Sequence, residues 1–310
     1  MSDMGAAETI RVGRRAIELT HPGRIYFPGR PPVTKRELVA YYVAAAPVML
    51  PYTQGRPVTL QRFPEGIEGE GFFQKETADW FPGWIPRATV PKEGGSTTYV
   101  LCNDAPTLAY LASQGCITPH VWLSRVDRPR HPDRLIFDLD PPRGFEQARA
   151  AARLLHDLLS RLGLASFVMT TGSRGLHVVA PLDRSADFDA VRGFARDAAA
   201  FLVARHPDEL TIEARIANRG DRLFLDTTRN AYAQTGVAPY AVRAKPGAPV
   251  ATPLHWEELD DPALSSQTWS LHNVLTRIER EGDPWRGIAR RRQGVGAAAA
   301  RLARLAAGHP

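Results

Sequence analysis

The chain has 310 residues, of which 44% are hydrophobic, enough for one large domain or two small ones with a substantial core. Its formal net charge of +6 favours a polyanionic partner. No stretch approaches the roughly 20 apolar residues of a membrane span, and the N-terminal residues contain no signal-peptide type of run, so we expect a cytoplasmic, nucleoid-associated protein without membrane contact.

Helix signals occur throughout the chain. Thr34 and Glu37 have the spacing of a capping box and precede apolar residues at helical intervals, which predicts a helix from about residue 35 until Pro47. Terminal proline and glycine signals, together with apolar spacing, predict further helices at about residues 106–115, 145–162 and 188–204. The basic, alanine- and arginine-rich residues 271–310 are expected to form a helix or tail outside a catalytic domain of residues 1–270.

Short strand-like pieces lie between and after these helices: "RLIFDLD", "SFVMT", "LHVVAP", "RLFLD" and "PYAVRA". The connection "TGSRG" between the second and third pieces is short enough for a hairpin, which argues against a purely parallel sheet. The sequence therefore predicts an α+β fold with a largely antiparallel or mixed β-sheet core flanked by helices.

The stretch "RLIFDLDPPRG" ends a predicted strand with two carboxylates, Asp138 and Asp140. Side chains at i and i+2 of a strand point to the same face, so these carboxylates repel each other unless a cation lies between them. A D-x-D at a strand end is often only a turn or a cap, and it also occurs in sugar-nucleotide transferases and in haloacid-dehalogenase-type phosphatases. The phosphatase pattern has a small residue or threonine at the position of Pro141 in this chain.

A third carboxylate, Asp226, ends the similar strand "RLFLD". If the two strands are neighbours, the three carboxylates converge and can bind Mg²⁺ or Mn²⁺, which prefer oxygen ligands. Because Cys102 and Cys116 are the only cysteines, no cysteine zinc site is available. Two such ions can activate an attacking hydroxyl and stabilise the leaving oxygen of a phosphoryl transfer.

The segment "TTGSRGLHVVAPL" lies between the two carboxylate strands and offers hydroxyls, glycines, a guanidinium and an imidazole. Such a turn can hold a triphosphate with N–H groups and side-chain donors, although an isolated glycine-rich turn is more often only a turn.

Taken together, the motifs resemble the polymerase domain of bacterial DNA ligase D, a member of the archaeo-eukaryotic primase superfamily. The resemblance covers about residues 18–260 and rests on "LTHPGRIYFP" with "TKRELVAYY", "RPVTLQRFPEG" with "GFFQK", "GCITPHVWLSRVDRP", "LIFDLDPP", "TTGSRGLHVV" and "LFLDTTRNAYAQTGVAPYAVRAKPGAPVATPLHWEEL". It implies template-directed nucleotidyl transfer at broken DNA ends, with a preference for ribonucleotides.

The resemblance also implies roles for individual residues. Two Mn²⁺ or Mg²⁺ ions would be bound by Asp138, Asp140 and Asp226. The incoming NTP or dNTP would be held by His120, Thr171, Ser173, Arg174, Arg229 and Arg243. The chain departs from the family pattern in having Arg174 where lysine is frequent, Thr171 where serine is usual, and Gln61 where a lysine can occur.

At the DNA end, the resemblance implies that Arg24 and Lys35 bind the 5′-phosphate of the downstream strand. Phe72 and Phe73 match residues that stack near the templating base, and adjacent strand residues face opposite ways, so at least one should be exposed. Arg62 would contact DNA from the neighbouring strand.

The sequence thus predicts a metal-dependent polymerase that fills or extends double-stranded DNA ends in non-homologous end joining. The chain has no K-x-D-G sequence of the kind that supplies a ligase's adenylated lysine, so we expect no ligase activity and a separate ATP-dependent DNA ligase and Ku as partners. The alternatives are a primase and a non-catalytic module that binds or bridges DNA ends.

Overall fold

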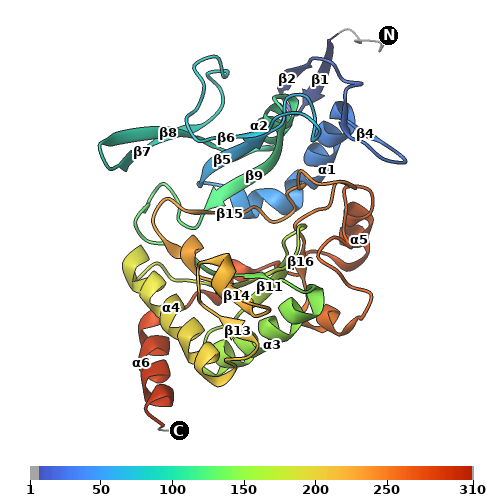
Figure 1. Cartoon of the computed structure of the whole chain (residues 1–310). Coiled ribbons are helices and arrows are strands. Elements are labelled where there is room, and N and C mark those ends of the chain that lie inside the picture. Colours follow the sequence, from blue (N-terminus) through green and yellow to red (C-terminus); the bar gives the residue numbers. More distant parts are fainter. Residues whose placement is uncertain (1–6, 309–310) are drawn as a thin grey trace. The chain divides into compact units, whose positions relative to one another are not determined.

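The computed structural model describes residues 7–308, which form two compact units (Figure 1). Unit 1 contains the described part of Met1–Trp122 together with Val237–Thr252 and Trp269–Gly282. Unit 2 contains Leu123–Gly236, Pro253–Thr268 and the described part of Asp283–Pro310. The chain passes between the units several times, so each unit is assembled from separate segments of sequence.

Unit 2 is built on a six-stranded sheet with the strand order β13-β14-β10-β12-β11-β16. Its strands are β10 (Arg134–Asp140), β11 (Phe167–Thr170), β12 (Leu176–Pro181), β13 (Leu210–Thr211), β14 (Leu223–Asp226) and β16 (Pro253–Leu254). Neighbouring strands are antiparallel except for β13 and β14. The predicted α+β class, the largely antiparallel sheet and the hairpin between β11 and β12 are therefore confirmed.

The helices of unit 2 are α3 (Phe145–Arg161), α4 (Phe188–Arg205) and α6 (Val295–Ala306), with the 3-10 helices η1 (Ile216–Asn218), η2 (Thr228–Asn230), η3 (Trp256–Asp260) and η4 (Ile288–Arg291). α3 and α4 pack against β10, and α6 packs against α4 (Figure 1). Leu135, Phe137 and Leu139 of β10 are completely buried. Because side chains alternate along a strand, Asp138 and Asp140 point to the face opposite these leucines and Phe137.

A second six-stranded sheet has the order β15-β9-β5-β8-β7, with β6 paired to β5. Its strands belong to unit 1, except that only Val237 of β15 does. Two small two-stranded sheets, β1-β2 and β3-β4, lie in the same unit. The strands are β1 (Glu8–Val12), β2 (Arg15–Leu19), β3 (Ile25–Phe27), β4 (Val33–Thr34), β5 (Pro57–Arg62), β6 (Phe72–Gln74), β7 (Arg87–Lys92), β8 (Gly95–Leu101), β9 (Cys116–Trp122) and β15 (Thr235–Val237).

The helices of unit 1 are α1 (Lys35–Thr53), α2 (Ala105–Ser113) and α5 (Val274–Glu281). α1 begins as predicted, because Thr34 and Glu37 form a reciprocal capping box. The predicted end at Pro47 is wrong, since the helix continues through Pro47 and Pro51 to Thr53. Proline removes a helical hydrogen bond, but the last turns bury Met49 and pack α1 along α2, and this packing outweighs the loss.

The prediction of a strand at "PYAVRA" is also wrong. Tyr240 has a left-handed backbone with φ of 66°, and the Ala241 amide donates to the Ala238 carbonyl in a turn. Val242 alone makes an isolated bridge, to Val250. A turn with positive φ is incompatible with a continuous extended strand, and the apolar composition of this segment reflects burial instead.

The described C-terminal residues, 271–308, include α5, η4 and α6. α5 belongs to unit 1, whereas η4 and α6 belong to unit 2, where the Trp285 indole donates to the Val168 carbonyl at 3.0 Å. The division of the chain at residue 270 stays a prediction. Within residues 7–308, every helix is too short or too polar to cross a membrane.

Candidate active site

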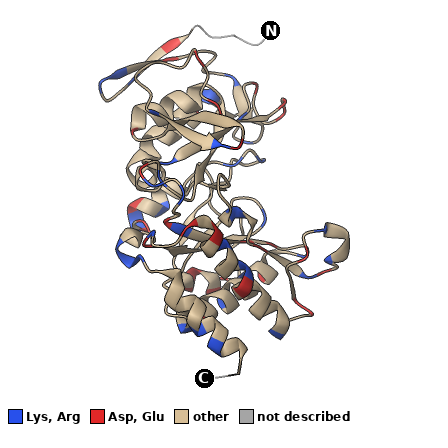
Figure 2. Ribbon diagram, turned by 90° about the vertical axis from the view of Figure 1, so that its left-hand side faces the viewer, with Lys and Arg blue, Asp and Glu red and all other residues tan. Residues whose placement is uncertain are grey.

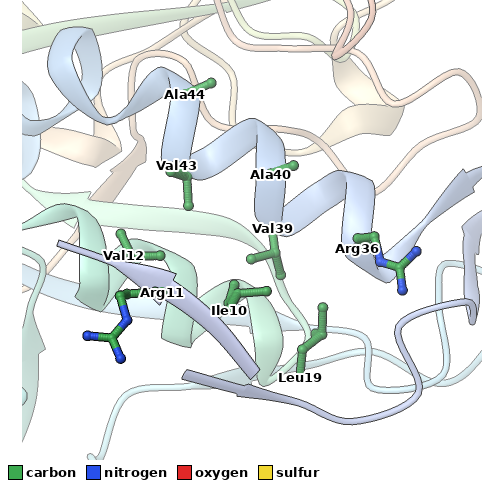
Figure 3. Close-up of a pocket in the computed structure, with 9 residues that line it drawn as sticks. All are labelled: Ile10, Arg11, Val12, Leu19, Arg36, Val39, Ala40, Val43 and Ala44. Carbon is green, nitrogen blue, oxygen red and sulfur yellow. The ribbon is translucent and has the colours of Figure 1, made fainter. Parts of the chain in front are cut away.

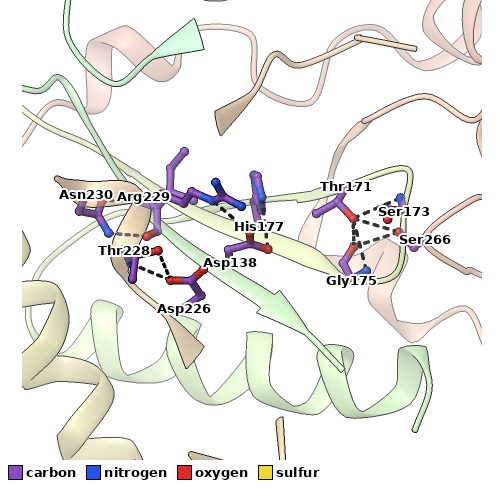
Figure 4. Close-up of polar contacts among 11 residues, drawn as sticks. Asp138, Thr171, Ser173, Gly175, His177, Asp226, Thr228, Arg229, Asn230 and Ser266 are labelled. Carbon is purple, nitrogen blue, oxygen red and sulfur yellow. Dashed lines mark hydrogen bonds and ion pairs between the residues drawn. The ribbon is translucent and has the colours of Figure 1, made fainter. Parts of the chain in front are cut away.

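The two carboxylate strands are neighbours in unit 2. β10 and β14 run antiparallel, with Asp138 directly opposite Asp226 (Figure 4). Directly opposed residues have Cβ atoms about 4.5–5.5 Å apart, and like charges at such positions repel. Asp140, two residues after Asp138, is exposed on the same side of its strand. The two carboxylate strands are therefore adjacent, as a shared metal site requires.

Asp138 is held by two nitrogen-bearing side chains. The His177 imidazole Nε2 lies 3.4 Å from one carboxylate oxygen, and Arg229 Nε lies 3.5 Å from the other (Figure 4). Burial alone raises the pKa of Asp138, but the charge and hydrogen bonds of His177 and Arg229 outweigh it and hold this pKa below its ordinary value. Asp138 is consequently ionised at neutral pH.

Asp226 is oriented by the residues that follow it. Its Oδ1 atom accepts hydrogen bonds from the Thr228 amide at 2.7 Å and the Thr228 hydroxyl at 2.6 Å. Asn230, at the end of η2, donates to the Ile136 carbonyl and accepts from the Ile136 amide, and so ties this turn to β10. The turn thereby fixes the carboxylate opposite Asp138.

The three carboxylates fit a hard divalent cation in chemistry, because they offer oxygen ligands from one side of two paired strands. Among residues 7–308, no group of three or more histidine, cysteine, aspartate or glutamate side chains meets the criterion for a preformed metal cluster. A bound cation would offset the repulsion between these carboxylates.

The hairpin between β11 and β12 contains polar groups that stabilise the turn itself and polar groups that remain available to a ligand (Figure 4). The buried Thr171 hydroxyl donates to the Gly175 carbonyl and accepts from the amides of Ser173 and Gly175, so it shapes the turn. A side chain at Gly175 would overlap the Leu139 carbonyl oxygen, which packs the turn tightly against β10. Arg174 is exposed, and neither its guanidinium nor the Ser173 hydroxyl makes a hydrogen bond or ion pair within residues 7–308.

The position of His177 next to Asp138 was not predicted from the sequence, in which this residue is only one imidazole of the hairpin. It is 4% exposed, and its Nδ1 atom has no hydrogen-bond partner within the described residues. The available signal was a single polar residue inside the otherwise apolar strand "LHVVAP". The register that places His177 opposite Asp138 depends on strand pairing, which the sequence did not specify.

In unit 1, the predicted aromatic residues lie next to predicted polar ones. Phe73 contacts His120 edge-on, with ring centroids 5.6 Å apart. Arg62 lies over the Phe72 ring at 5.4 Å. Phe72 and Phe73 are 45% and 60% exposed, so side chains on both faces of β6 are accessible. The expected exposure is confirmed.

Arg24 and Lys35 are also brought together, since the Lys35 amide donates to the Arg24 carbonyl at 2.8 Å. The Arg24 side chain donates to the Pro64 carbonyl and pairs with Glu65 at 2.6 Å. The Lys35 amine donates to the Thr20 carbonyl at 2.8 Å. Burial, followed by the charge of Arg24, lowers the pKa of Lys35 to about 8.

Arg243 lies half-buried in unit 1, where its amide donates to the Pro249 carbonyl at 2.7 Å. A groove of about 290 Å³ lies elsewhere in unit 1, between β1, β2 and α1 (Figure 3). Its lining is formed by Ile10, Arg11, Val12, Leu19, Arg36, Val39, Ala40, Val43 and Ala44. This lining contains no carboxylate or hydroxyl, so the groove does not suit metal-dependent phosphoryl transfer.

Charged residues of both signs are interspersed along the ribbon (Figure 2). The net charge of the chain therefore does not locate a nucleic-acid surface by itself, and individual side chains must do so.

Comparison with known proteins agrees with this geometry. The family model described as "LigD, primase-polymerase domain" matches residues 34–285. The chain belongs to the LigD primase-polymerase family.

The LigD relatives are longer than this chain. The multifunctional non-homologous end joining DNA repair protein LigD of Mycobacterium tuberculosis is 37% identical over 290 residues, which cover 90% of this chain and 37% of that protein. The multifunctional non-homologous end joining protein LigD of Pseudomonas aeruginosa is 32% identical over 297 residues, covering 94% of this chain and 35% of that protein. The chain thus spans little more than a third of these relatives.

Among solved structures, the polymerase domain from Mycobacterium tuberculosis ligase D in complex with DNA matches with a TM-score of 0.83 and 36% identity. The match covers 89% of this chain and 98% of that domain. The fold of this chain is consequently that of a LigD polymerase domain.

Proposed function

We propose that the chain is a metal-dependent, template-directed nucleotidyltransferase that fills or extends DNA ends during bacterial non-homologous end joining. The observation that carries the proposal is the pairing of Asp138 opposite Asp226, beside a hairpin with exposed donors, in a LigD primase-polymerase fold. The solved relative that contains DNA supports DNA as the partner.

Asp138, Asp140 and Asp226 would hold Mn²⁺ or Mg²⁺. The ions supply charge stabilisation to the attacking and leaving oxygens of the transferred phosphoryl group. Asp138 is kept ionised by His177 and Arg229, so it needs no proton loss before binding a cation. Ser173 and Arg174, at the hairpin tip, would donate hydrogen bonds to phosphate oxygens, and Thr171 holds the turn that carries them.

The finer parts of the proposal concern DNA and nucleotide choice. Arg24 and Lys35 would bind a 5′-phosphate, Phe72 and Phe73 would stack on bases, and Arg62 would contact the DNA backbone. His120 and Arg243 would contribute to nucleotide binding. A site that hydrogen-bonds a ribose 2′-hydroxyl would leave a buried polar group unpaired with deoxyribose, so ribonucleotides should be preferred. Ku and an ATP-dependent ligase are the proposed partners.

The test is primer extension on a gapped duplex with a downstream 5′-phosphate, with each NTP or dNTP and with Mn²⁺, Mg²⁺ or EDTA. We expect templated addition that requires metal and has a higher kcat/KM with ribonucleotides. Addition only on unprimed templates would favour a primase. DNA-end binding without addition under any condition would favour a bridging module.

A further inference from the structure

We propose that Trp80 is an additional base-stacking residue, which together with Phe72 and Arg62 binds an unpaired template base. This inference rests on the proposed function, since it assumes a DNA template. Trp80 lies outside the motifs that suggested a DNA-binding surface, and its position in unit 1 is what connects it to them.

The connection between these residues is made by the Arg62 guanidinium. Its central carbon lies 5.4 Å from the centre of the Phe72 ring and 5.6 Å from the centre of the Trp80 ring. Hydrogen bonds from Nε to the Gln114 carbonyl at 2.9 Å and from Nη1 to Gln74 at 2.7 Å hold the guanidinium in place. Two aromatic rings are therefore gathered around one fixed cation.

Both rings remain accessible to a ligand. Trp80 is 57% exposed and Phe72 is 45% exposed, and they are among the few large apolar side chains exposed in the described residues. Exposure of an indole of this size is unfavourable in water, so a surface built from such rings is typical of a binding site. The remaining nitrogen, Arg62 Nη2, donates to no protein group within residues 7–308 and is available to a phosphate oxygen.

Trp80 is not carried on a loosely held loop. The next residue, Phe81, is 3% exposed and contacts Tyr110 edge-on at 5.3 Å. Arg87 donates to the carbonyls of Phe81 and Pro82 at 2.6 Å and 3.1 Å. The indole is thus presented by an anchored turn, which lowers the entropy lost when a ligand stacks on it.

The chemistry of the occupant follows from this surface. Aromatic rings around a cation fit a nucleobase joined to a phosphate, and stacking accepts every base because each has a π-face. Bases inside a duplex are already stacked on their neighbours, so only an unpaired base can use the indole. The predicted occupant is therefore a single-stranded segment of the template, bound without regard to sequence.

The test compares two DNAs that carry the same 5′-phosphate, one with unpaired template bases and one fully paired, bound without nucleotide. Trp80→Ala should weaken binding to the first by about fivefold to a hundredfold and leave the second unchanged. Trp80→Phe should keep most of the affinity. Ile216→Ala, which changes a 79% exposed apolar side chain in unit 2, serves as the matched control and should affect neither DNA.

A second measurement uses 2-aminopurine at successive template positions. The wild-type chain should quench one unpaired position strongly, and Trp80→Ala should abolish that quenching. Equal losses on both DNAs, no loss on either, or no quenched position would overturn the inference. Because no nucleotide is added, a chain that stacks on DNA but never extends it would refute the proposed function and leave this inference standing.

Discussion

The two units hold their functional side chains by different means. In unit 2, Asp138 is largely buried and is held between the imidazole of His177 and the guanidinium of Arg229. In unit 1, Phe72 and Phe73 are exposed, and Arg62 is held by ring faces and by neutral hydrogen-bond acceptors. Buried charge favours a fixed geometry for a cation and a reacting phosphate, whereas exposed rings and cations favour affinity for many DNA sequences. We therefore propose that unit 2 carries the chemistry and that unit 1 supplies affinity for DNA.

The largest effect is expected when a carboxylate is removed from unit 2. Asp138→Asn should reduce nucleotide addition by about a thousandfold or more, because the ions stabilise the transition state by several kcal/mol. Affinity for DNA ends should change by less than about twofold, since basic side chains supply it. Single-turnover gap filling and fluorescence anisotropy measure the two quantities.

Asp157→Asn is the matched control, because Asp157 is an exposed aspartate of α3 in the same unit. It should leave both quantities unchanged. A variant at Asp138 that retained full extension activity would contradict the assignment of chemistry to this residue.

The next largest effect concerns binding of the DNA 5′-phosphate by residues of unit 1. DNA with a downstream 5′-phosphate should bind about tenfold more tightly than DNA with a 5′-hydroxyl, because charge-assisted hydrogen bonds to a dianion are strong. Arg24→Ala combined with Lys35→Met should remove the difference. Methionine keeps the packing of the Lys35 stem, which is buried. Equilibrium titrations with both DNAs at one salt concentration provide the measurement.

Arg36→Ala is the control here, since Arg36 is one residue along the helix and pairs with Glu8 on the surface. Arg36→Ala should keep the preference for DNA with the 5′-phosphate. Equal binding of both DNA ends by the wild-type chain would contradict a role of Arg24 and Lys35 in recognising the phosphate.

The pH dependence of phosphate binding gives a smaller effect. The pKa of Lys35 is about 8, so its amine is mostly charged at pH 7 and mostly neutral at pH 9. The contribution of this charge is present below the pKa and lost as the pH rises through it. Affinity for the 5′-phosphate should fall by about threefold to tenfold between these pH values, and Lys35→Met should remove the fall. A pH-independent preference in the wild-type chain would contradict this role for Lys35.

The smallest effect comes from adding a charge to unit 1. Gln61 lies next to Arg62 on β5 and opposite Phe73 on β6. Gln61→Lys should strengthen DNA binding about twofold to threefold at low salt. One added phosphate contact should also make the slope of log affinity against log salt concentration steeper by about 0.7 for single-stranded DNA or about 0.9 for duplex DNA. Gln54→Lys, at the exposed end of α1, is the control and should leave the slope unchanged.

Local signals explain which parts of the fold could be predicted. The capping box at Thr34 fixes the start of α1 within a few residues, and alternation in "RLIFDLD" fixes the side of the strand that carries Asp138. Apart from the strands of Arg62 and of the two phenylalanines, the sheet of unit 1 was not predicted, because its strands are irregular in composition. β9, for example, contains Pro119 between Thr118 and His120. Its strands are specified by their neighbours more than by their own sequence.

The same difference between local signals and long-range pairing explains which site residues could be predicted. Asp138 and Asp226 were identified from strand ends, which are local, and the resemblance to a family added the residues of unit 1. The contact of His177 with Asp138 depends on the register of β10 and β12, which no local pattern determines. The role of Thr171 within its turn likewise depends on the Gly175 carbonyl that it reaches. Trp80 is part of no recognisable motif, and only its short distance to Arg62 in the structure indicates a role.

The most direct test of the division between the units is a titration of Mn²⁺, in the presence of a non-hydrolysable nucleotide, monitored by the electron paramagnetic resonance of the free ion. The wild-type chain should bind Mn²⁺ saturably. Asp138→Asn and Asp226→Asn should each lose most of that binding, while Arg24→Ala, in unit 1, should retain it. Equal Mn²⁺ binding by the wild-type chain and both aspartate variants would contradict the assignment of the metal to the paired strands of unit 2.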